Sequence, residues 1–257
     1  MTRTDRRVLA VRDGREFLLA PGDTQETDLG VLEVPEDVRP GAVVETHLGE
    51  GFEIRKLRGP DLFDHLERTG APMMPRDIGL VVGHTGVASG DRILDAGTGT
   101  GVLSAYLGRL GCDVTTYEID PEFAEVAREN MSTAGVAAAV DVRTGDLTEA
   151  LDELSADVDA PDEGFDLLTL DTADAAAVVE RATELLASGG YVAVYSPFVE
   201  SAREAVESAR DARLSDIETL ETIQRRMDFD DRGSRPSTAG VGHTGYLVFA
   251  RFRPQFE

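Results

Sequence analysis

The sequence predicts an α/β protein with a doubly wound, mostly parallel, seven-stranded sheet and a small N-terminal β domain. From residue 92 onward, short apolar segments alternate with longer helical ones, which is typical of a parallel sheet covered by helices on both faces. Before residue 60, short strand-like segments are separated by glycine-containing turns. We therefore expect a small β domain over residues 1–60 and the α/β domain over residues 61–257.

The first 60 residues contain two hairpin signals. Residues 8–11 and 17–19 flank the turn Asp13-Gly14, and residues 42–47 and 52–57 flank a second glycine-containing turn at residues 49–51. These segments predict a β module of about four strands. A short helix is expected over residues 62–68, between Pro60 and Pro72, and Pro75-Arg76-Asp77 opens another that continues over residues 78–85.

The α/β part has a regular order of elements. Strands are expected at residues 92–95, 113–118, 140–143, 165–170 and 191–195, and helices at residues 102–110, 121–134, 173–186 and 199–210. The last two strands, over residues 217–227 and 246–252, have no helix between them, which predicts an antiparallel edge. Residues 152–163 hold six acids and are expected to form a solvated turn or a disordered insertion.

The charge of the chain is strongly negative. It has 49 acidic and 25 basic residues, a formal net charge of −24, and Lys56 is its only lysine. At molar salt the Debye length falls to roughly 3 Å, which screens the self-repulsion. This balance predicts a salt-rich cytoplasm, as in a halophile, with an ordinary acidic cytosolic protein as the alternative. It does not exclude a nucleic-acid partner, because counterion release contributes little to affinity at high salt.

Other features bound the compartment and the chemistry. No apolar run approaches the roughly 20 residues of a membrane span, and no apolar segment follows the charged N-terminus as in a secretory signal. The single cysteine, Cys112, has no intrachain partner, so a cytoplasmic protein is expected. His47, His65 and His84 lack metal-ligand spacing, and no metal site is expected.

A glycine-rich run is the main motif. Residues 95–101, DAGTGTG, follow a predicted strand and open a helix, where glycines allow the backbone to approach a ligand and free N–H groups point toward it. The spacing is G-x-G-x-G and not the G-x-G-x-x-G of dinucleotide-binding proteins, which disfavours a nicotinamide or flavin cofactor.

Three acids follow other strands at the same sheet edge. Glu118 ends the second strand, where a carboxylate can accept hydrogen bonds from both ribose hydroxyls of an adenosine-bearing cofactor. Asp146 follows the third strand and fits a contact to an adenine amino group, although a plain Gly-Asp turn is an equal alternative. Asp171 ends the fourth strand, where it can orient an amino group or take a proton from the substrate.

The order of these elements resembles class I methyltransferases, and two longer runs resemble archaeal tRNA (adenine-N1)-methyltransferases. The runs are residues 75–104, which begin with PRDIG, and residues 241–251, VGHTGYLVFAR. A small N-terminal β domain is also expected in that family. The resemblance implies transfer of a methyl group from S-adenosyl-L-methionine to N1 of T-loop adenosine in tRNA, at position 57, position 58 or both. It also implies a homotetramer.

The resemblance assigns roles to ten residues. It implies that the methionine end of the cofactor lies on Gly97, Thr98, Gly99, Thr100, Gly101, Val102 and Leu103. It further places Glu118 on the ribose, Asp146 on the adenine and Asp171 on the target base.

One departure keeps alternatives open. The family commonly has a proline-bearing D-L-P-x-P type motif at the fourth strand, whereas this chain has Asp171-Thr172-Ala173-Asp174. A methyltransferase for a small molecule or a protein, and a non-catalytic partner subunit, are therefore the competing hypotheses. Arg55, Lys56 and Arg58 form the densest basic cluster, but pairing with the abundant acids is as plausible for them as phosphate contact. His243 is expected to be a neutral structural residue.

Overall fold

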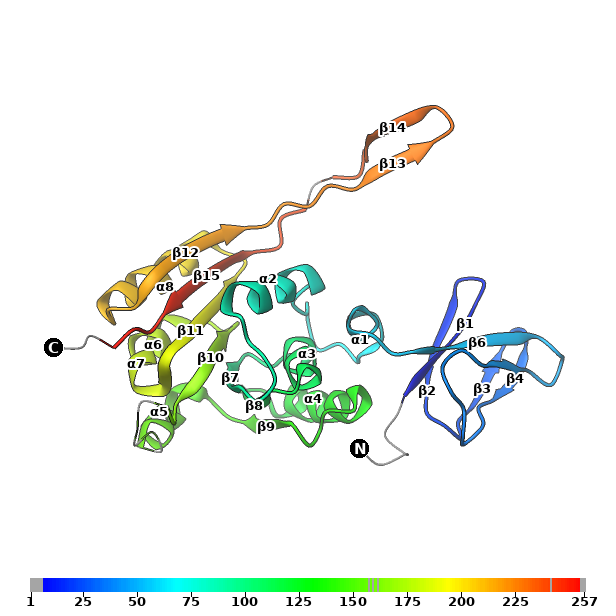
Figure 1. Ribbon diagram of the computed structural model, residues 1–257, viewed down its shortest axis with the longest axis horizontal. Coiled ribbons are helices and arrows are strands. Elements are labelled where there is room, and N and C mark those ends of the chain that lie inside the picture. Colours follow the sequence, from blue (N-terminus) through cyan, green and yellow to red (C-terminus); the bar gives the residue numbers. More distant parts are fainter. Residues whose placement is uncertain (1–6, 157, 159, 161, 241, 255–257) are drawn as a thin grey trace.

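A seven-stranded sheet forms the centre of the α/β part of the chain (Figure 1). The computed structural model describes residues 7–254 except 157, 159, 161 and 241. The strand order is β12-β15-β11-β10-β7-β8-β9. The strands are β7 (Arg92–Ala96), β8 (Asp113–Glu118), β9 (Val140–Thr144), β10 (Phe165–Leu170), β11 (Leu186–Ser196), β12 (Ser215–Glu221) and β15 (Tyr246–Arg251).

The sheet is parallel except at one edge. β9, β8, β7, β10 and β11 run parallel, and β15 pairs antiparallel with both β11 and β12. The seven strands, their mostly parallel pairing and the antiparallel edge confirm the predicted fold class. Because β12 and β15 are joined without a crossover helix, the chain can only add them as an antiparallel pair.

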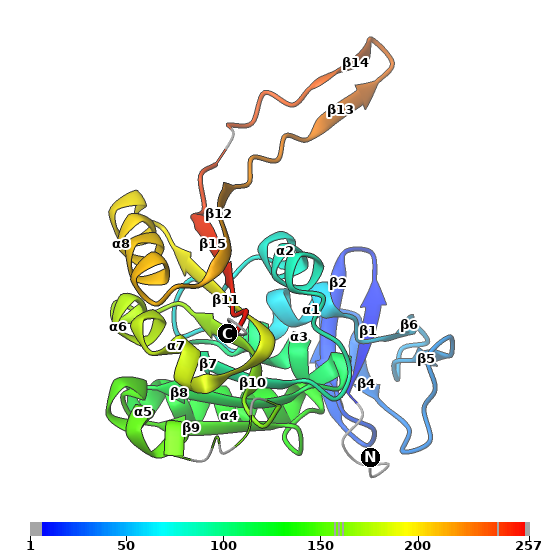
Figure 2. The same ribbon diagram turned by 60° about the vertical axis from the view of Figure 1, so that its left-hand side comes forward.

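Helices cover both faces of this sheet (Figure 2). One face packs under α2 (Pro75–Thr85), α3 (Val102–Leu110) and α4 (Pro121–Ala134) around Ile93, Val114 and Leu167. The other face packs under α5 (Leu147–Ala156), α6 (Ala175–Glu180), α7 (Ala182–Leu185) and α8 (Val199–Asp211) around buried alternate positions of the same strands. Helix α1 (Gly59–His65) contacts α2 and α3.

Six strands form the N-terminal β module (Figure 1). They are β1 (Val8–Arg12), β2 (Arg15–Leu19), β3 (Thr24–Thr27), β4 (Gly30–Glu33), β5 (Val43–Glu45) and β6 (Gly51–Lys56). The sheet β2-β1-β6-β5 contains both predicted hairpins, β1–β2 and β5–β6. The pair β3–β4 was not predicted, because each of its strands is only four residues long. The module has a separate core around Leu32, Phe52 and Ile54.

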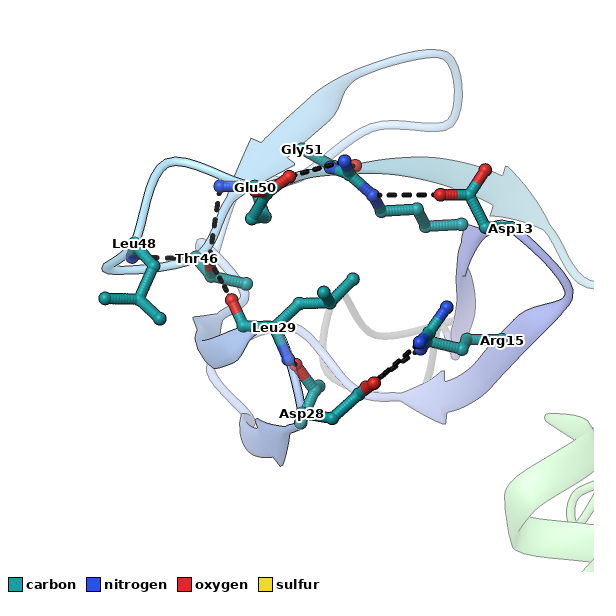
Figure 3. Close-up of polar contacts among 10 residues, drawn as sticks. Asp13, Arg15, Asp28, Leu29, Thr46, Leu48, Glu50 and Gly51 are labelled. Carbon is teal, nitrogen blue, oxygen red and sulfur yellow. Dashed lines mark hydrogen bonds and ion pairs between the residues drawn. The ribbon is translucent and has the colours of Figure 1, made fainter.

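Polar contacts hold the loops of this module together (Figure 3). The Thr46 hydroxyl donates to the Leu29 carbonyl at 2.8 Å and accepts from the N–H groups of Leu48 and Glu50. Arg15 donates two hydrogen bonds, of 2.8 and 2.6 Å, to the Asp28 carboxylate. The two-stranded piece and the four-stranded sheet are thereby tied at several points.

The structure corrects the predictions for residues 152–163 and 173–186. Residues 152–156 of the acidic stretch belong to α5, whose Leu147, Leu151 and Leu154 are buried at helical spacing; residues 157, 159 and 161 lie outside the described residues. The helix expected over residues 173–186 is two short helices, α6 and α7, and β11 begins at Leu186, before the glycine pair that was expected to end the helix.

A two-stranded hairpin projects from the end of the sheet (Figures 1 and 2). It consists of β13 (Met227–Asp230) and β14 (Gly233–Pro236), and it leaves the sheet where β12 ends. We call residues 222–240 the arm. The sequence predicted one extended strand over residues 217–227, and the structure instead ends β12 at Glu221. None of the helices in the described ranges is long and apolar enough to cross a membrane.

Candidate functional site

The carboxyl ends of β7, β8, β9 and β10 meet at one edge of the sheet and form a cleft there. A larger cavity of about 480 Å³ is bounded by the strand ends, and a smaller adjoining one lies beside the glycine loop. All ten residues to which the sequence assigned roles line one or both of these cavities: Gly97, Thr98, Gly99, Thr100, Gly101, Val102, Leu103, Glu118, Asp146 and Asp171.

The glycine loop, residues 95–101, bends sharply between β7 and α3. Gly97, Gly99 and Gly101 have φ angles of 85°, 51° and 78°, in the left-handed region that glycine adopts without strain. A Cβ atom on Gly97 would lie 2.0 Å from the backbone oxygen of Asp171. Glycine at position 97 therefore lets the loop lie directly against the end of β10.

The start of α3 points free donors toward the cleft. The first helical bond runs from Ala105 N to Gly101 O at 2.8 Å, so the N–H groups of Val102, Leu103 and Ser104 have no helical partner. An anionic group is stabilised at such a helix start by these donors and by the helix dipole. The carboxylate of an amino acid moiety is an anionic group that these free N–H donors can bind.

Glu118 is held rigidly at the end of β8. Only 7% of the residue is exposed; its Oε2 accepts from Gly99 N at 2.8 Å and its Oε1 accepts from Asp120 N at 3.1 Å. Each carboxylate oxygen has a second lone pair, so two further donors can bind here. A ribose with two neighbouring hydroxyls supplies two such donors. Ile119 and Phe123, 68% and 38% exposed, add apolar surface to the same cavity.

Asp146 has a structural contact as well as a place in the cavity. Its Oδ1 accepts from both the backbone N–H and the hydroxyl of Thr148, at 2.8 Å each, which caps the start of α5. The Oδ2 atom is the part of this carboxylate that is left for a ligand. The structure therefore shows the structural contact of the Gly-Asp turn, and the contact of Asp146 to an adenine stays a prediction.

Asp95, the first residue of the glycine loop, is buried and accepts three hydroxyl hydrogen bonds. Ser104 and Thr116 donate to its Oδ2 at 2.8 and 2.6 Å, and Thr169 donates to its Oδ1 at 2.5 Å. Burial raises the pKa of Asp95, and the three hydroxyls oppose that rise. The carboxylate therefore ties β7, β8, β10 and α3 together directly beneath the cleft.

Replacement of Thr169 by valine is expected to lower the free energy of unfolding by about 1.5–3 kcal/mol, because the buried Asp95 oxygen loses its donor. Chemical denaturation in high salt measures this change. Thr115→Val, on strand β8 of the same sheet, is the matched control because Thr115 is only half-buried. Equal effects of the two variants would contradict the role given to the Asp95 cluster.

Asp171 lies just after β10, with its side chain open to the cleft. The surrounding protein withdraws water from the carboxyl group and raises its pKa to about 7, and negative Asp95 acts in the same direction. A carboxyl group with a pKa near neutrality at a cleft is a candidate for proton transfer or for stabilising a developing cation. Thr172, Ala173 and Asp174 continue along the larger cavity.

The sequence reasoning missed one wall of the cleft. The segment before α2 lines the smaller cavity with Thr69, Gly70, Ala71, Pro72 and Met73. The Thr69 hydroxyl is buried and has no hydrogen-bond partner within the described part of the chain. A buried orphan hydroxyl is satisfied when a polar ligand fills the cavity. The only sequence signal was the position of this segment, immediately before PRDIG.

The two runs that carried the sequence resemblance contact each other. Arg76 of the PRDIG run donates to the Thr244 hydroxyl at 2.5 Å, and Thr244 in turn donates to Asp77 at 3.4 Å. Tyr195 donates to the Thr244 carbonyl at 2.8 Å. These contacts attach α2 to the ends of β11 and β15, next to the strand that carries Asp171.

The remaining candidates have structural contacts. Both ring nitrogens of His243 face acceptors, Glu221 Oε1 at 2.8 Å and Pro197 O at 3.1 Å, and these acceptors raise its pKa. These contacts agree with the structural role expected for His243, and its neutral form stays a prediction. Arg55 pairs with Glu53 at 2.8 Å, as the charge balance allowed. Cys112 is buried, and burial raises its pKa to about 11.

Residues 64–233 match the family described as the tRNA methyltransferase complex GCD14 subunit. The chain is 31% identical to the tRNA (adenine(57)-N(1)/adenine(58)-N(1))-methyltransferase TrmI of Methanocaldococcus jannaschii, over 97% of this chain and 95% of that protein. It is 28% identical to the tRNA (adenine(58)-N(1))-methyltransferase TrmI of Thermus thermophilus, over 95% of each chain.

Solved structures share the architecture along the whole chain. A SAM-dependent O-methyltransferase from Thermotoga maritima superposes with a TM-score of 0.78 at 27% identity, over 100% of this chain and 96% of that one. The tRNA (m1A58) methyltransferase TrmI of Aquifex aeolicus superposes with a TM-score of 0.71 at 22% identity, over 97% and 98% of the two chains. The second likeness supports the fold alone.

Proposed function

The chain belongs to the tRNA methyltransferase complex GCD14 subunit family, and we propose that it methylates N1 of T-loop adenosine in tRNA, at position 57, position 58 or both. The observation that carries this proposal is the 31% identity to an enzyme named for both adenosines, which extends over nearly the full length of both chains. The methyl donor is S-adenosyl-L-methionine.

The cleft fits this donor in three parts. We assign the methionine end to residues 97–103, where the orphan N–H groups of α3 meet the carboxylate. Glu118 holds the ribose hydroxyls with the lone pairs that Gly99 and Asp120 leave free. The free Oδ2 of Asp146 accepts from the adenine amino group. The bound donor supplies an activated methyl group on a sulfonium.

Asp171 acts on the target base. N1 of adenine carries a lone pair, so a new N–C bond forms without prior removal of a proton, while the electrons of the S–CH₃ bond remain on sulfur. The adenine ring gains one positive charge in this step. We assign Asp171 to accept a hydrogen bond from the exocyclic amino group and to stabilise that charge. The base must leave its stack to reach this cleft.

Two alternatives remain distinct from this proposal. A small-molecule or protein methyltransferase on the same fold is suggested by the O-methyltransferase from Thermotoga maritima. We call residues 97–103, Glu118 and Asp146 the cofactor cradle. The intact cradle argues against a non-catalytic partner subunit, because a subunit without activity does not need Glu118 with two oxygens positioned for a ligand.

Nucleoside analysis separates these functions. The protein is incubated in molar KCl with labelled S-adenosyl-L-methionine and unmodified tRNA, and the digest is examined for 1-methyladenosine. Transcripts with guanosine at position 57, at position 58 or at both show which adenosine is used. We expect label in 1-methyladenosine and none on the double variant. Absence of 1-methyladenosine despite bound donor would overturn the tRNA proposal.

We propose that the arm joins copies of the chain into a homotetramer. Its Ile223, Met227 and Phe229 side chains are 62%, 49% and 76% exposed, and a two-stranded hairpin without a packed face is marginally stable in water. Phe229→Ser with Met227→Ser is expected to lower the mass measured by sedimentation velocity. Leu48→Ser, equally apolar and exposed at 65% but located in the β module, is the control. A monomeric wild-type protein would contradict this assignment.

We propose that the protein works in a salt-rich cytoplasm. Its net charge of −24 predicts that the melting temperature falls as KCl is lowered from molar to millimolar concentration, because screening of the self-repulsion is lost. Thermal unfolding followed by circular dichroism across a KCl series measures this. An unchanged melting temperature without salt would show that the acidic surface is not an adaptation to salt.

A further inference from the structure

Asn130 is a buried amide on the inner face of α4. Only 3% of the residue is exposed, although its neighbours on this face, Ala127, Met131 and Ala134, are small or apolar core residues. A buried polar side chain among apolar ones costs free energy unless all its hydrogen bonds are made. The partners of Asn130 therefore indicate what it holds.

All three hydrogen bonds of the Asn130 amide connect segments that are distant in the sequence. Its Nδ2 donates to Glu67 O at 2.8 Å and to Thr100 O at 2.9 Å, and its Oδ1 accepts from Glu67 N at 3.0 Å. Glu67 is thus bound through both of its backbone groups, as in a strand pair. Thr100 belongs to the glycine loop.

The segment that Asn130 fixes is the wall missed by the sequence. Residues 69–73 begin two positions after Glu67 and line the smaller cavity together with the glycine loop. One further bond, from Thr69 N to Thr100 Oγ1 at 3.4 Å, joins the two walls. Asn130 itself is absent from the lining of that cavity, so it acts on the cleft through its two partners.

We propose that Asn130 is a positioning residue for cofactor binding, which sets the distance between residues 67–73 and the glycine loop across the methionine end of the cleft. The inference rests on the cofactor cradle proposed above and is independent of the tRNA assignment. Only an amide provides two donors and one acceptor in one plane. In Asn130→Asp the carboxylate would still accept the hydrogen bond from Glu67 N. Its negative charge would, however, face the carbonyl oxygens of Glu67 and Thr100, to which the amide donates.

The test is the dissociation constant of S-adenosyl-L-methionine, measured by titration calorimetry on the full chain in molar KCl. Asn130→Ala is expected to weaken binding about tenfold or more, because residues 67–73 are then no longer held beside the glycine loop and must be ordered when the cofactor binds. Thr46→Val is the matched control: Thr46 is 4% exposed and also makes three hydrogen bonds, but lies in the β module (Figure 3). It is expected to lower stability and leave the dissociation constant unchanged.

Hydrogen exchange on the wild-type protein provides a second readout that does not depend on a folded variant. The Glu67 amide is expected to exchange slowly without cofactor, since Asn130 accepts its proton, and residues 67–73 are expected to gain protection when the cofactor binds. In Asn130→Ala the loss of protection is expected to be confined to residues 67–73 and the glycine loop.

An unchanged dissociation constant for Asn130→Ala, or an equal weakening by Thr46→Val, would overturn the positioning role. Rapid exchange of the Glu67 amide in the wild-type protein would do the same. Glu118→Ala, measured in parallel, separates this failure from that of the cradle: if Glu118→Ala also binds the cofactor normally, the cradle itself is misplaced. If only Glu118→Ala loses binding, the cradle stands and the inference about Asn130 is wrong.

Discussion

Replacement of Asp171 by asparagine is expected to lower kcat about a hundredfold or more, the magnitude typical of losing one charged group that stabilises a transition state. Asparagine keeps the size of the side chain and removes its negative charge, so the adenine ring becomes cationic without compensation. Single-turnover methylation of tRNA measures the chemical step. The dissociation constant of S-adenosyl-L-methionine is expected to stay within about threefold, since the cradle residues are untouched.

Stability separates this result from misfolding. Asp171 is exposed toward the cleft, but the protein atoms around its carboxyl group and the nearby Asp95 raise its pKa to about 7, so the ionised carboxylate is less favourable in the folded chain than in the unfolded chain. The stability linked to this group is therefore present at low pH and is lost as the pH rises toward 7. At pH 8 we expect Asp171→Asn to melt at the same temperature as the wild type or higher. A much lower melting temperature would mean that the activity was lost through unfolding.

The same pKa gives the wild-type enzyme a pH dependence. If the carboxylate is the active form, kcat rises as Asp171 ionises through about pH 7 and is level above it. Asp171→Asn is expected to show no such step in its residual activity. A wild-type profile that is flat from pH 6 to pH 8 would remove the charged form of Asp171 from the chemical step.

Replacement of Gly97 by alanine is expected to abolish measurable cofactor binding and to destabilise the α/β domain. The added Cβ would lie 2.0 Å from the backbone oxygen of Asp171, and backbone on both sides of this contact belongs to the sheet edge. In addition, a φ of 85° costs an L-residue roughly 1–2 kcal/mol. The loop and the end of β10 must therefore separate, which displaces Asp171 as well.

Gly86→Ala isolates the conformational part of this effect. Gly86 ends α2 with a φ of 71°, and nothing lies within 4 Å of an added Cβ. We expect this variant to lose only about 1–2 kcal/mol of stability and to bind cofactor normally. Titration calorimetry and chemical denaturation of both variants test the comparison. Normal cofactor binding by Gly97→Ala would show that close packing of the loop on β10 is not required.

Local sequence signals predicted the central elements well. The helices over residues 102–110 and 121–134 and the strands over residues 113–118 and 165–170 have the predicted bounds, because glycine and proline mark their ends and apolar residues repeat with a clear period. The weaker predictions share a cause. The strands of the pairs β3–β4 and β13–β14 are only four residues long, which is too short for a hydrophobic period to distinguish them from loops. In α5 the apolar period of Leu147, Leu151 and Leu154 was present and was obscured by the surrounding acids.

The sequence by itself determined the fold class, the glycine loop and the three acids at the strand ends, because each of these depends on neighbours in the chain and on the rule that parallel strands end at one edge. Only the tertiary structure decided which residues face the glycine loop. Asn130 and Glu67 are 63 positions apart, and Arg76 and Thr244 are 168 apart. No local period or motif encodes such pairs. Asn130 and the core residue Ala127 lie on the same face of α4, so the helical pattern does not distinguish them. Only the packed chain shows which partners satisfy the hydrogen bonds of the Asn130 amide.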